Sequence, residues 1–274
     1  MEKNNDFEKL LSLPYDDFVK ELKDLCNHHA VRALIKNGKH DGEIDDEKIR
    51  AFERSLAVKD LKPTQCEIGI SDYFKSNKRR IANIIKGNTS YLNKNRILVA
   101  YLDDKYYIID GHHRWCKIFL FNPDAHVPAI ILNFEKLGYK DPEDILKIIQ
   151  LALASTYKKI ITEKEKDPFN ALEKIKKKEL REIISSPFIN FLENEWDLDE
   201  EGIMEKLSNH LEMIRETKTK ERIQRIFMPQ TTETGKNDKM VDGQPKKFLK
   251  RLRNGEVDFK EPYIKSFENF KYNI

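Results

Sequence analysis

Two short runs of strand-forming residues, followed closely by a helix, most constrain what this chain can fold into. Residues 97–102 and 106–109 are rich in β-branched and aromatic side chains, and residues 103–105 (DDK) lie between them. This pattern predicts a β-hairpin. The next residues, 112–122 (HHRWCKIFLFN), predict a helix, and residues 126–134 (HVPAIILNF) predict another strand. A hairpin, a helix and a strand in such close succession indicate a compact α/β unit.

The segments on either side of this unit are predicted to be mainly helical. Residues 7–25 place apolar side chains at helical spacing, and residues 45–56 open with acidic residues in a first turn. The same pattern recurs at residues 141–166, 167–184 and 199–216. We expect these helices to flank the α/β unit.

The predicted fold class is α/β (α+β), with a small mixed sheet between two helical regions. A short strand is expected within residues 56–70, and it leaves through a turn at Pro63. The segments expected along the chain are an N-terminal helical region (1–55), the core (56–140), a second helical region (141–227), a flexible loop or linker (228–247) and a C-terminal tail (248–274).

The composition narrows the class of protein. Fifty basic and 47 acidic side chains give a net charge of only +3, which is small for a dedicated nucleic-acid binder, although net charge hides a local basic groove. No window approaches 18 consecutive apolar residues and the first residues are polar, so neither a membrane span nor a secretory signal is expected. Three widely spaced cysteines suit a reducing compartment. We therefore expect a cytoplasmic protein, in the host cytoplasm if the chain comes from a phage.

The sequence Asp110-Gly111-His112-His113-Arg114 joins the predicted hairpin to the predicted helix. A strand that ends here and a helix that begins here create a helix N-terminus, whose amides and dipole attract phosphate. Gly111 lets a phosphate approach the backbone and allows a positive φ. Arg114 offers a forked cation, and the two imidazoles can donate hydrogen bonds and titrate near neutral pH. The turn is therefore a candidate phosphate site.

Asp110 has several roles open to it: it can cap the helix, hold a histidine tautomer, or coordinate a metal ion that arrives with a nucleotide. The plain alternative makes Asp110 an ordinary N-cap, Gly111 a turn glycine and the next residues a polar surface. The apolar run from Trp115 to Phe119 argues against this alternative, because a buried helix places its polar first turn at the rim of a core.

Together with residues 61–68 (LKPTQCEI), this turn resembles the ParB/sulfiredoxin superfamily. In that superfamily a strand and a Pro-containing loop precede a strand, a Gly-x-x-Arg turn and a helix that bind phosphate. The resemblance covers about residues 56–134. The Asp-Gly-His-His-Arg sequence is similar to one branch, which includes the ADP-dependent free-serine kinases and transfers phosphate from a nucleotide to a hydroxyl.

Two other branches of the superfamily match less well. Sulfiredoxins have a catalytic cysteine where this chain has His112, and Cys116 lies a helical turn further on. Partition ParB proteins have Gly-Glu-Arg-Arg in the turn and a helix-turn-helix domain next. Residues after 141 lack the turn glycine expected of such a domain.

The kinase-like resemblance implies a phosphotransferase or nucleotide hydrolase that uses ADP or ATP, with CTP as a further candidate, together with Mg²⁺ and a small hydroxyl-bearing substrate. The upstream loop of those kinases supplies a glutamate base, which Glu67 matches. The residues expected to take part in catalysis are Glu67, Asp110 and His113. Those expected to bind phosphate are Gly111, His112, His113 and Arg114. Further contacts to substrate or phosphate are expected from Thr64, Gln65, Arg79 and Arg80.

Two other functions stay open from the sequence. The same phosphate site can hold a nucleic-acid backbone in a nuclease or a binding protein, and Arg79 and Arg80 in the basic run 75–80 suit this role. These arginines are equally compatible with the solvent-exposed start of a helix. The third reading is a non-catalytic protein that keeps the fold. Oligomeric state is not indicated by the sequence.

Overall fold

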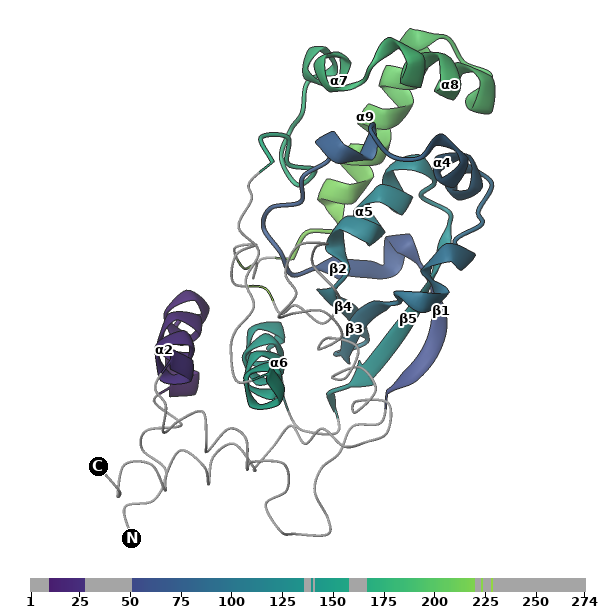
Figure 1. The fold of residues 1–274 in the computed structure, drawn as a ribbon. Helices are drawn as coiled ribbons and strands as arrows, with labels where there is room; N and C mark the ends of the chain where they lie inside the picture. The colour runs from purple at the N-terminus through teal and green to yellow at the C-terminus, as the bar shows by residue number, and fades with distance from the viewer. Residues whose placement is uncertain are drawn as a thin grey trace, which may run out of the picture.

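The computed structural model describes residues 10–27, 51–135, 139, 141–157, 167–219, 223 and 228. Its centre is a five-stranded mixed sheet with the order β1-β5-β3-β4-β2 (Figure 1). The strands are β1 (Phe52–Ala57), β2 (Leu61–Pro63), β3 (Ile97–Leu102), β4 (Lys105–Asp110) and β5 (His126–Asn133). The pairs β1–β5 and β3–β4 are antiparallel, whereas β3–β5 and β2–β4 are parallel. The predicted mixed-sheet α+β class is confirmed.

Strands β3 and β4 form the predicted hairpin. Asp103 and Asp104 make its two-residue turn, with φ of 50° and 54°. Positive φ at both central residues is the signature of a type I′ turn, whose twist matches that of the flanking strands. The Tyr101 hydroxyl donates to Asp104 Oδ1 at 2.6 Å and closes the turn. The hairpin brings the chain directly to the Asp110-Gly111 junction.

Helices cover both faces of the sheet. The α-helices of the described residues are α2 (Tyr15–Asn27), α4 (Lys78–Ile85), α5 (His112–Phe121), α6 (Pro142–Tyr157), α7 (Lys177–Ile183), α8 (Ser186–Trp196) and α9 (Glu200–Glu216). Short 3₁₀ helices are η1 (Val58–Asp60), η2 (Ser71–Tyr73) and η3 (Ser90–Lys94). No helix in this part of the chain combines the length and apolar character needed to cross a membrane.

Side-chain alternation along β3 divides the core into two layers. Leu98, Ala100 and Leu102 face a cluster that includes buried residues of α2 and α6, which pack against each other (Figure 1). Ile97 and Val99 face the other cluster, which includes α4, α5 and the helices α7 to α9. The predicted helical regions before and after the core thus both contribute to burying the sheet.

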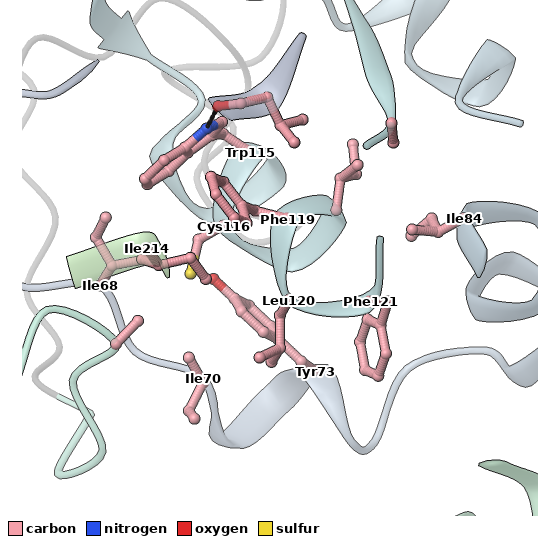
Figure 2. Close-up of a cluster of buried hydrophobic side chains, with 14 of the residues drawn as sticks. Ile68, Ile70, Tyr73, Ile84, Trp115, Cys116, Phe119, Leu120, Phe121 and Ile214 are labelled. Atoms are coloured by element: carbon pink, nitrogen blue, oxygen red, sulfur yellow. Dashed lines mark hydrogen bonds between the residues drawn. The ribbon is translucent and has the colours of Figure 1, made fainter. Parts of the chain in front are cut away.

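Helix α5 lies at the centre of the second cluster. Trp115 is fully buried and its indole N–H donates to the Val58 carbonyl at 2.8 Å, as Figure 2 shows. On the opposite end, His210 Nδ1 of α9 lies 2.7 Å from the Leu120 carbonyl. Both contacts satisfy polar groups inside the core, so the position of α5 is set from η1 on one side and from α9 on the other.

Two of the predicted helices are wrong in part. Phe52–Ala57 form β1 and not the end of a helix, because all six residues pair with residues 126–131 of β5, which supplies the strand's hydrogen bonds. The predicted helix 167–184 is helical only from Lys177 to Ile183. Residues 167–173 are irregular because the side chains of Asp167 and Asn170 bond to backbone groups and compete with a helix.

Other predicted boundaries are met more closely. The strand expected within 56–70 is divided into the end of β1, the turn η1 and β2, which ends at Pro63. The predicted linker (228–247) and tail (248–274) lie outside the described residues, apart from Met228. The domain boundaries themselves stay predictions.

Replacing Trp115 with Phe should lower the free energy of unfolding by about 2 kcal/mol. The smaller ring leaves a void, and the Val58 carbonyl loses its buried donor. Equilibrium urea denaturation measures the change. Phe52→Leu is the control, because this side chain is 41% exposed on β1 and its loss should cost less than about 0.5 kcal/mol. Equal losses in the two variants would show that the Trp115 contact contributes nothing specific.

Candidate functional site

Gly111 forms the turn between β4 and α5. Its φ is 107°, in the left-handed region, and it serves as the N-cap of α5 with no side-chain capping bond. Asp110, an N-cap in the plain alternative, instead ends β4. The first main-chain bond of the helix runs from the Trp115 amide to the Gly111 carbonyl at 2.9 Å. The backbone N–H groups of residues 112–114 lie before this first bond of the helix. They point out of its N-terminus, as the N–H groups of anion-binding sites do.

Arg114 is folded back over this turn. A Cβ placed on Gly111 would lie 3.0 Å from Arg114 Nη2, so any other residue here would displace the guanidinium by a few tenths of an ångström and adopt an unfavourable φ. Arg114 Nη1 donates to the Asn95 carbonyl at 2.6 Å, and Nη2 lies 3.4 Å from Asp110 Oδ2. The cation is therefore already oriented beside the helix N-terminus, next to a largely buried carboxylate.

The His112 side chain is buried and is bonded to the upstream loop. Its imidazole is 3% exposed, and Nε2 accepts a hydrogen bond from the Thr64 amide at 3.1 Å. Burial lowers the pKa of His112 to about 3, so the ring is neutral and carries its proton on Nδ1. The imidazole therefore holds the upstream loop in place, and its Nε2 is already occupied by the Thr64 amide.

Residues 64–67 form a loop that is fastened to the first turn of α5. Thr64 also donates its hydroxyl to the Ile108 carbonyl at 2.6 Å, so its amide bonds to α5 and its hydroxyl bonds to β4. Gln65 is buried, and its side-chain amide donates to the Glu67 carbonyl. Glu67 is half-buried at the end of this loop. Thr64, Gln65 and the turn therefore form one hydrogen-bonded unit, and Glu67 follows directly.

The same loop is held from the C-terminal side of the chain. The Cys66 amide donates to the Ile223 carbonyl at 2.9 Å, and the Ile223 amide donates to the Thr64 carbonyl at 2.8 Å. This parallel bridge adds a strand-like contact beside Gln65. Ile223, which follows α9 in the sequence, therefore borders the candidate site.

A further support, the strap (residues 167–171), lies along the continuation of the loop. Asn170 Oδ1 accepts from the Ile68 amide at 2.9 Å, and its Nδ2 donates to the Cys66 carbonyl at 3.0 Å. Asp167 accepts from the amide and the hydroxyl of Ser71 at 2.9 and 2.8 Å. The sequence reasoning missed these residues, although an Asp-Pro pair followed by Asn is a recognised turn signal.

His113 and Tyr73 lie on the other side of the turn. His113 Nδ1 is 3.5 Å from the Tyr73 hydroxyl, and the two rings meet edge to face at 6.4 Å. The Tyr73 hydroxyl also bonds the thiol of Cys116, toward which it points in Figure 2. Burial raises the pKa of Cys116 to about 12, so this thiol is protonated and unreactive at neutral pH.

The two candidate arginines of α4 differ in position. Asn77 caps this helix, and its Oδ1 accepts from the Arg79 amide at 2.9 Å. The Arg80 guanidinium lies 5.0 Å from the ring of Tyr91. Burial raises the pKa of Tyr91, and the charges of Arg80 and then of Arg114 lower it. Arg80 therefore lies beside Tyr91 on the helix that packs against α5, while no interaction among the described residues connects Arg79 with the turn.

The described residues contain no group of three or more His, Cys, Asp or Glu side chains arranged to hold a metal ion. Mg²⁺ bound together with a nucleotide needs only one or two protein carboxylates, because phosphate oxygens and water supply the other ligands. Asp110, beside the turn, is the carboxylate that fits such an ion. The residues therefore suit a metal that arrives with phosphate rather than one held by protein alone.

Replacing His112 with Gln should remove a pH dependence of stability. In the unfolded chain His112 takes up a proton as the pH falls through its ordinary pKa of 6.5. In the folded protein its pKa is about 3, so the imidazole stays neutral over most of that interval. The wild type therefore loses stability over that interval, by at most about 1.4 kcal/mol per pH unit from this residue. Gln keeps an acceptor for the Thr64 amide without titrating.

Urea denaturation at several pH values between about 4.5 and 7 measures the slope, an interval in which the two states differ in bound protons. His126→Gln is the control, because it also replaces one histidine, at an exposed position on β5. His210, whose pKa burial also lowers, contributes equally to all three proteins. An unchanged slope in His112→Gln would contradict the assignment of a buried neutral imidazole.

The comparison with protein families agrees with this architecture. The model of the family described as "Putative ParB-like nuclease" matches residues 54–241, which is more than half of the 274 residues. The match includes β2 to β5, the Gly111 turn, the strap and α9. A search of curated proteins found no match. The resemblance to the ParB/sulfiredoxin superfamily is therefore confirmed at the level of the family, and the chain belongs to the ParB-like nuclease family.

Proposed function

We propose that the chain binds a nucleotide by its phosphates at the N-terminus of α5 and transfers a phosphoryl group from it to a hydroxyl or to water. The observation that carries this proposal is the Gly111 turn, with φ of 107° and the Arg114 guanidinium folded against it. A buried helix, an open backbone and an oriented cation at one point match the charge and shape of a phosphate.

The electrostatics of the turn support phosphate binding. The first turn of α5 carries the positive end of the helix dipole, worth roughly half an elementary charge. Arg114 adds a forked donor whose orientation is already set by the Asn95 carbonyl and Asp110. Binding of a ligand here therefore requires little further ordering of the Arg114 side chain, and this lower entropic cost improves affinity.

The loop of residues 64–67 is the proposed side of the acceptor. Glu67 follows Thr64, whose amide bonds to His112 in the first turn of α5. By the resemblance to the kinase branch, Glu67 takes the proton from the acceptor hydroxyl, and Gln65 shapes the loop through its bond to the Glu67 carbonyl. The strap and Ile223 hold this loop at a fixed place relative to the phosphate site.

When Mg²⁺ is bound together with the nucleotide, it would neutralise the negative charge that develops on the transferred phosphoryl group. Asp110 is positioned to share that ion, and its contact with Arg114 keeps both groups beside the phosphate site. His113, held edge-on against Tyr73, offers an imidazole on the opposite side of the turn. ADP, ATP and CTP are the proposed donors.

A second candidate function is cleavage or binding of a nucleic-acid backbone. The family description favours it, and so does the exposed basic start of α4 at Lys78, Arg79 and Arg80. In this case the same turn holds one phosphate of a strand, and α4 contacts its neighbours.

Replacing Gly111 with Ala should weaken nucleotide binding at least tenfold. The added methyl group meets Arg114 at 3.0 Å and enters the space of the phosphate. Gly87→Ala is the matched control, since Gly87 also has a positive φ, 77°, with no atom nearer than 4.0 Å. Placing alanine at a positive φ destabilises the folded protein by about 1 kcal/mol in each variant. The difference between the nucleotide affinities of the two variants therefore reports on the site itself.

Isothermal titration calorimetry with ADP, ATP and CTP plus Mg²⁺ measures these affinities, and a single-stranded oligonucleotide is titrated in parallel. Wild-type affinity for nucleotide in Gly111→Ala would remove the turn as the site. Oligonucleotide binding that depends on Gly111, without nucleotide binding, would establish the second function instead. Absence of both would refute both functions.

Replacing Glu67 with Gln should separate binding from chemistry. Loss of a general base lowers kcat by about a hundredfold or more, while the Kd for nucleotide changes less than about threefold. Nucleotide hydrolysis, followed by phosphate release, measures the rate with water as acceptor. Glu135→Gln, an exposed site after β5, is the control and should keep both constants. An unchanged kcat in Glu67→Gln would rule out this residue as the base.

A further inference from the structure

Two cations not needed by the Gly111 turn itself lie in the seam between α4 and α5. Lys117 is three residues after Arg114, so the two side chains leave the same face of α5. Lys117 Nζ donates to the Ser76 hydroxyl at 2.8 Å and lies 5.1 Å from the ring of Tyr73. Across the seam, α4 packs against α5 and carries Arg80.

Aromatic rings restrain both cations. Tyr73 holds Lys117, and Tyr91 lies 5.0 Å from the Arg80 guanidinium, a distance at which a ring face attracts a cation. Tyr73 also contacts His113, and the charges of Arg80 and Arg114 lower the pKa of Tyr91. Lys117 is thus connected with the turn through Tyr73, and Arg80 lies on the helix that packs against α5.

The charges of this pair are not balanced by protein carboxylates. Neither Lys117 nor Arg80 forms an ion pair with any described residue. The acid that acts on Lys117 is Asp72, whose exposed carboxylate lies 3.4 Å from Lys75 Nζ. Lys117 is half-buried and lies close to the start of α4 through its bond to Ser76, and burial and the charge of Arg80 lower its pKa. An anion between them would relieve that repulsion.

We propose that Lys117 and Arg80 bind a second phosphoryl group, next to the one held by the Gly111 turn, so that the ligand is a nucleoside diphosphate or a longer polyphosphate. This inference rests on the proposed function, in which the turn binds a nucleotide phosphate. It adds that the site binds at least two phosphoryl groups, and that Lys117 and Arg80 bind the second one.

The spacing along α5 suits adjacent phosphoryl groups. Three residues separate Arg114 from Lys117, which is a rise of about 4.5 Å along the helix. Two phosphoryl groups joined by one bridging oxygen fit within that interval. Consecutive phosphates of a nucleic-acid strand are separated by a whole sugar, so the seam is better matched to a diphosphate.

Competition against a fluorescent ADP analogue tests this assignment, because it measures AMP and ADP on one scale. Lys117→Met and Arg80→Gln should each weaken ADP about tenfold and AMP less than threefold, since AMP places its single phosphate in the turn. Lys20→Met on α2, an exposed lysine that belongs to the other helical layer, is the charge-matched control and should change neither. Circular dichroism and thermal melting verify that each variant is folded. Arg80 is exposed, so its variant keeps the test valid if Lys117→Met is unstable.

Equal losses for AMP and ADP, or no loss for ADP, would overturn the second phosphate site. If ADP binding depends on Gly111 but not on Lys117 or Arg80, the proposed function stands and this inference fails. If the wild type binds neither AMP nor ADP, the proposed function fails as well. A single-stranded oligonucleotide that loses affinity in Lys117→Met, while ADP does not bind, would assign these cations to a nucleic-acid backbone and refute the diphosphate.

Discussion

The burial of α5 is the constraint on which the rest of the structure depends. Its apolar side chains pack between the sheet and α9, and Trp115 and Leu120 are anchored by hydrogen bonds to η1 and α9. A helix fixed in this way has its first turn fixed too. The chain must enter it from β4 without a side chain in the way, and Gly111 at φ 107° is the residue that allows this.

The candidate site is built on that turn by segments that are far apart in the sequence. His112 reaches back to Thr64, the strap binds Cys66 and Ile68, and Ile223 borders Gln65. Each of these contacts satisfies a backbone group that would otherwise be costly to bury. The loop and the turn therefore keep their relation through polar contacts, while the apolar cluster below them supplies the stability.

Local patterns were sufficient for elements whose own residues carry a clear strand, turn or helix pattern. The hairpin, α5 and β5 were predicted because alternation, turn residues and apolar runs report on their own residues. They failed for Phe52–Ala57 and for residues 167–173, where the outcome depends on a partner strand or on side chains that bond to distant amides. A pattern within one segment holds no information on such a partner.

What the sequence by itself determined is the α5 turn: a glycine flanked by Asp110 and Arg114, placed between a strand and a buried helix. Only the tertiary structure decided what each polar side chain does there. His112 became a buried acceptor because Thr64, 48 positions away, lies against it, and Lys117 bonds to Ser76 because the start of α4 packs on α5. Charge, protonation and hydrogen-bond roles depend on neighbours in space, and those neighbours are set by packing rather than by order along the chain.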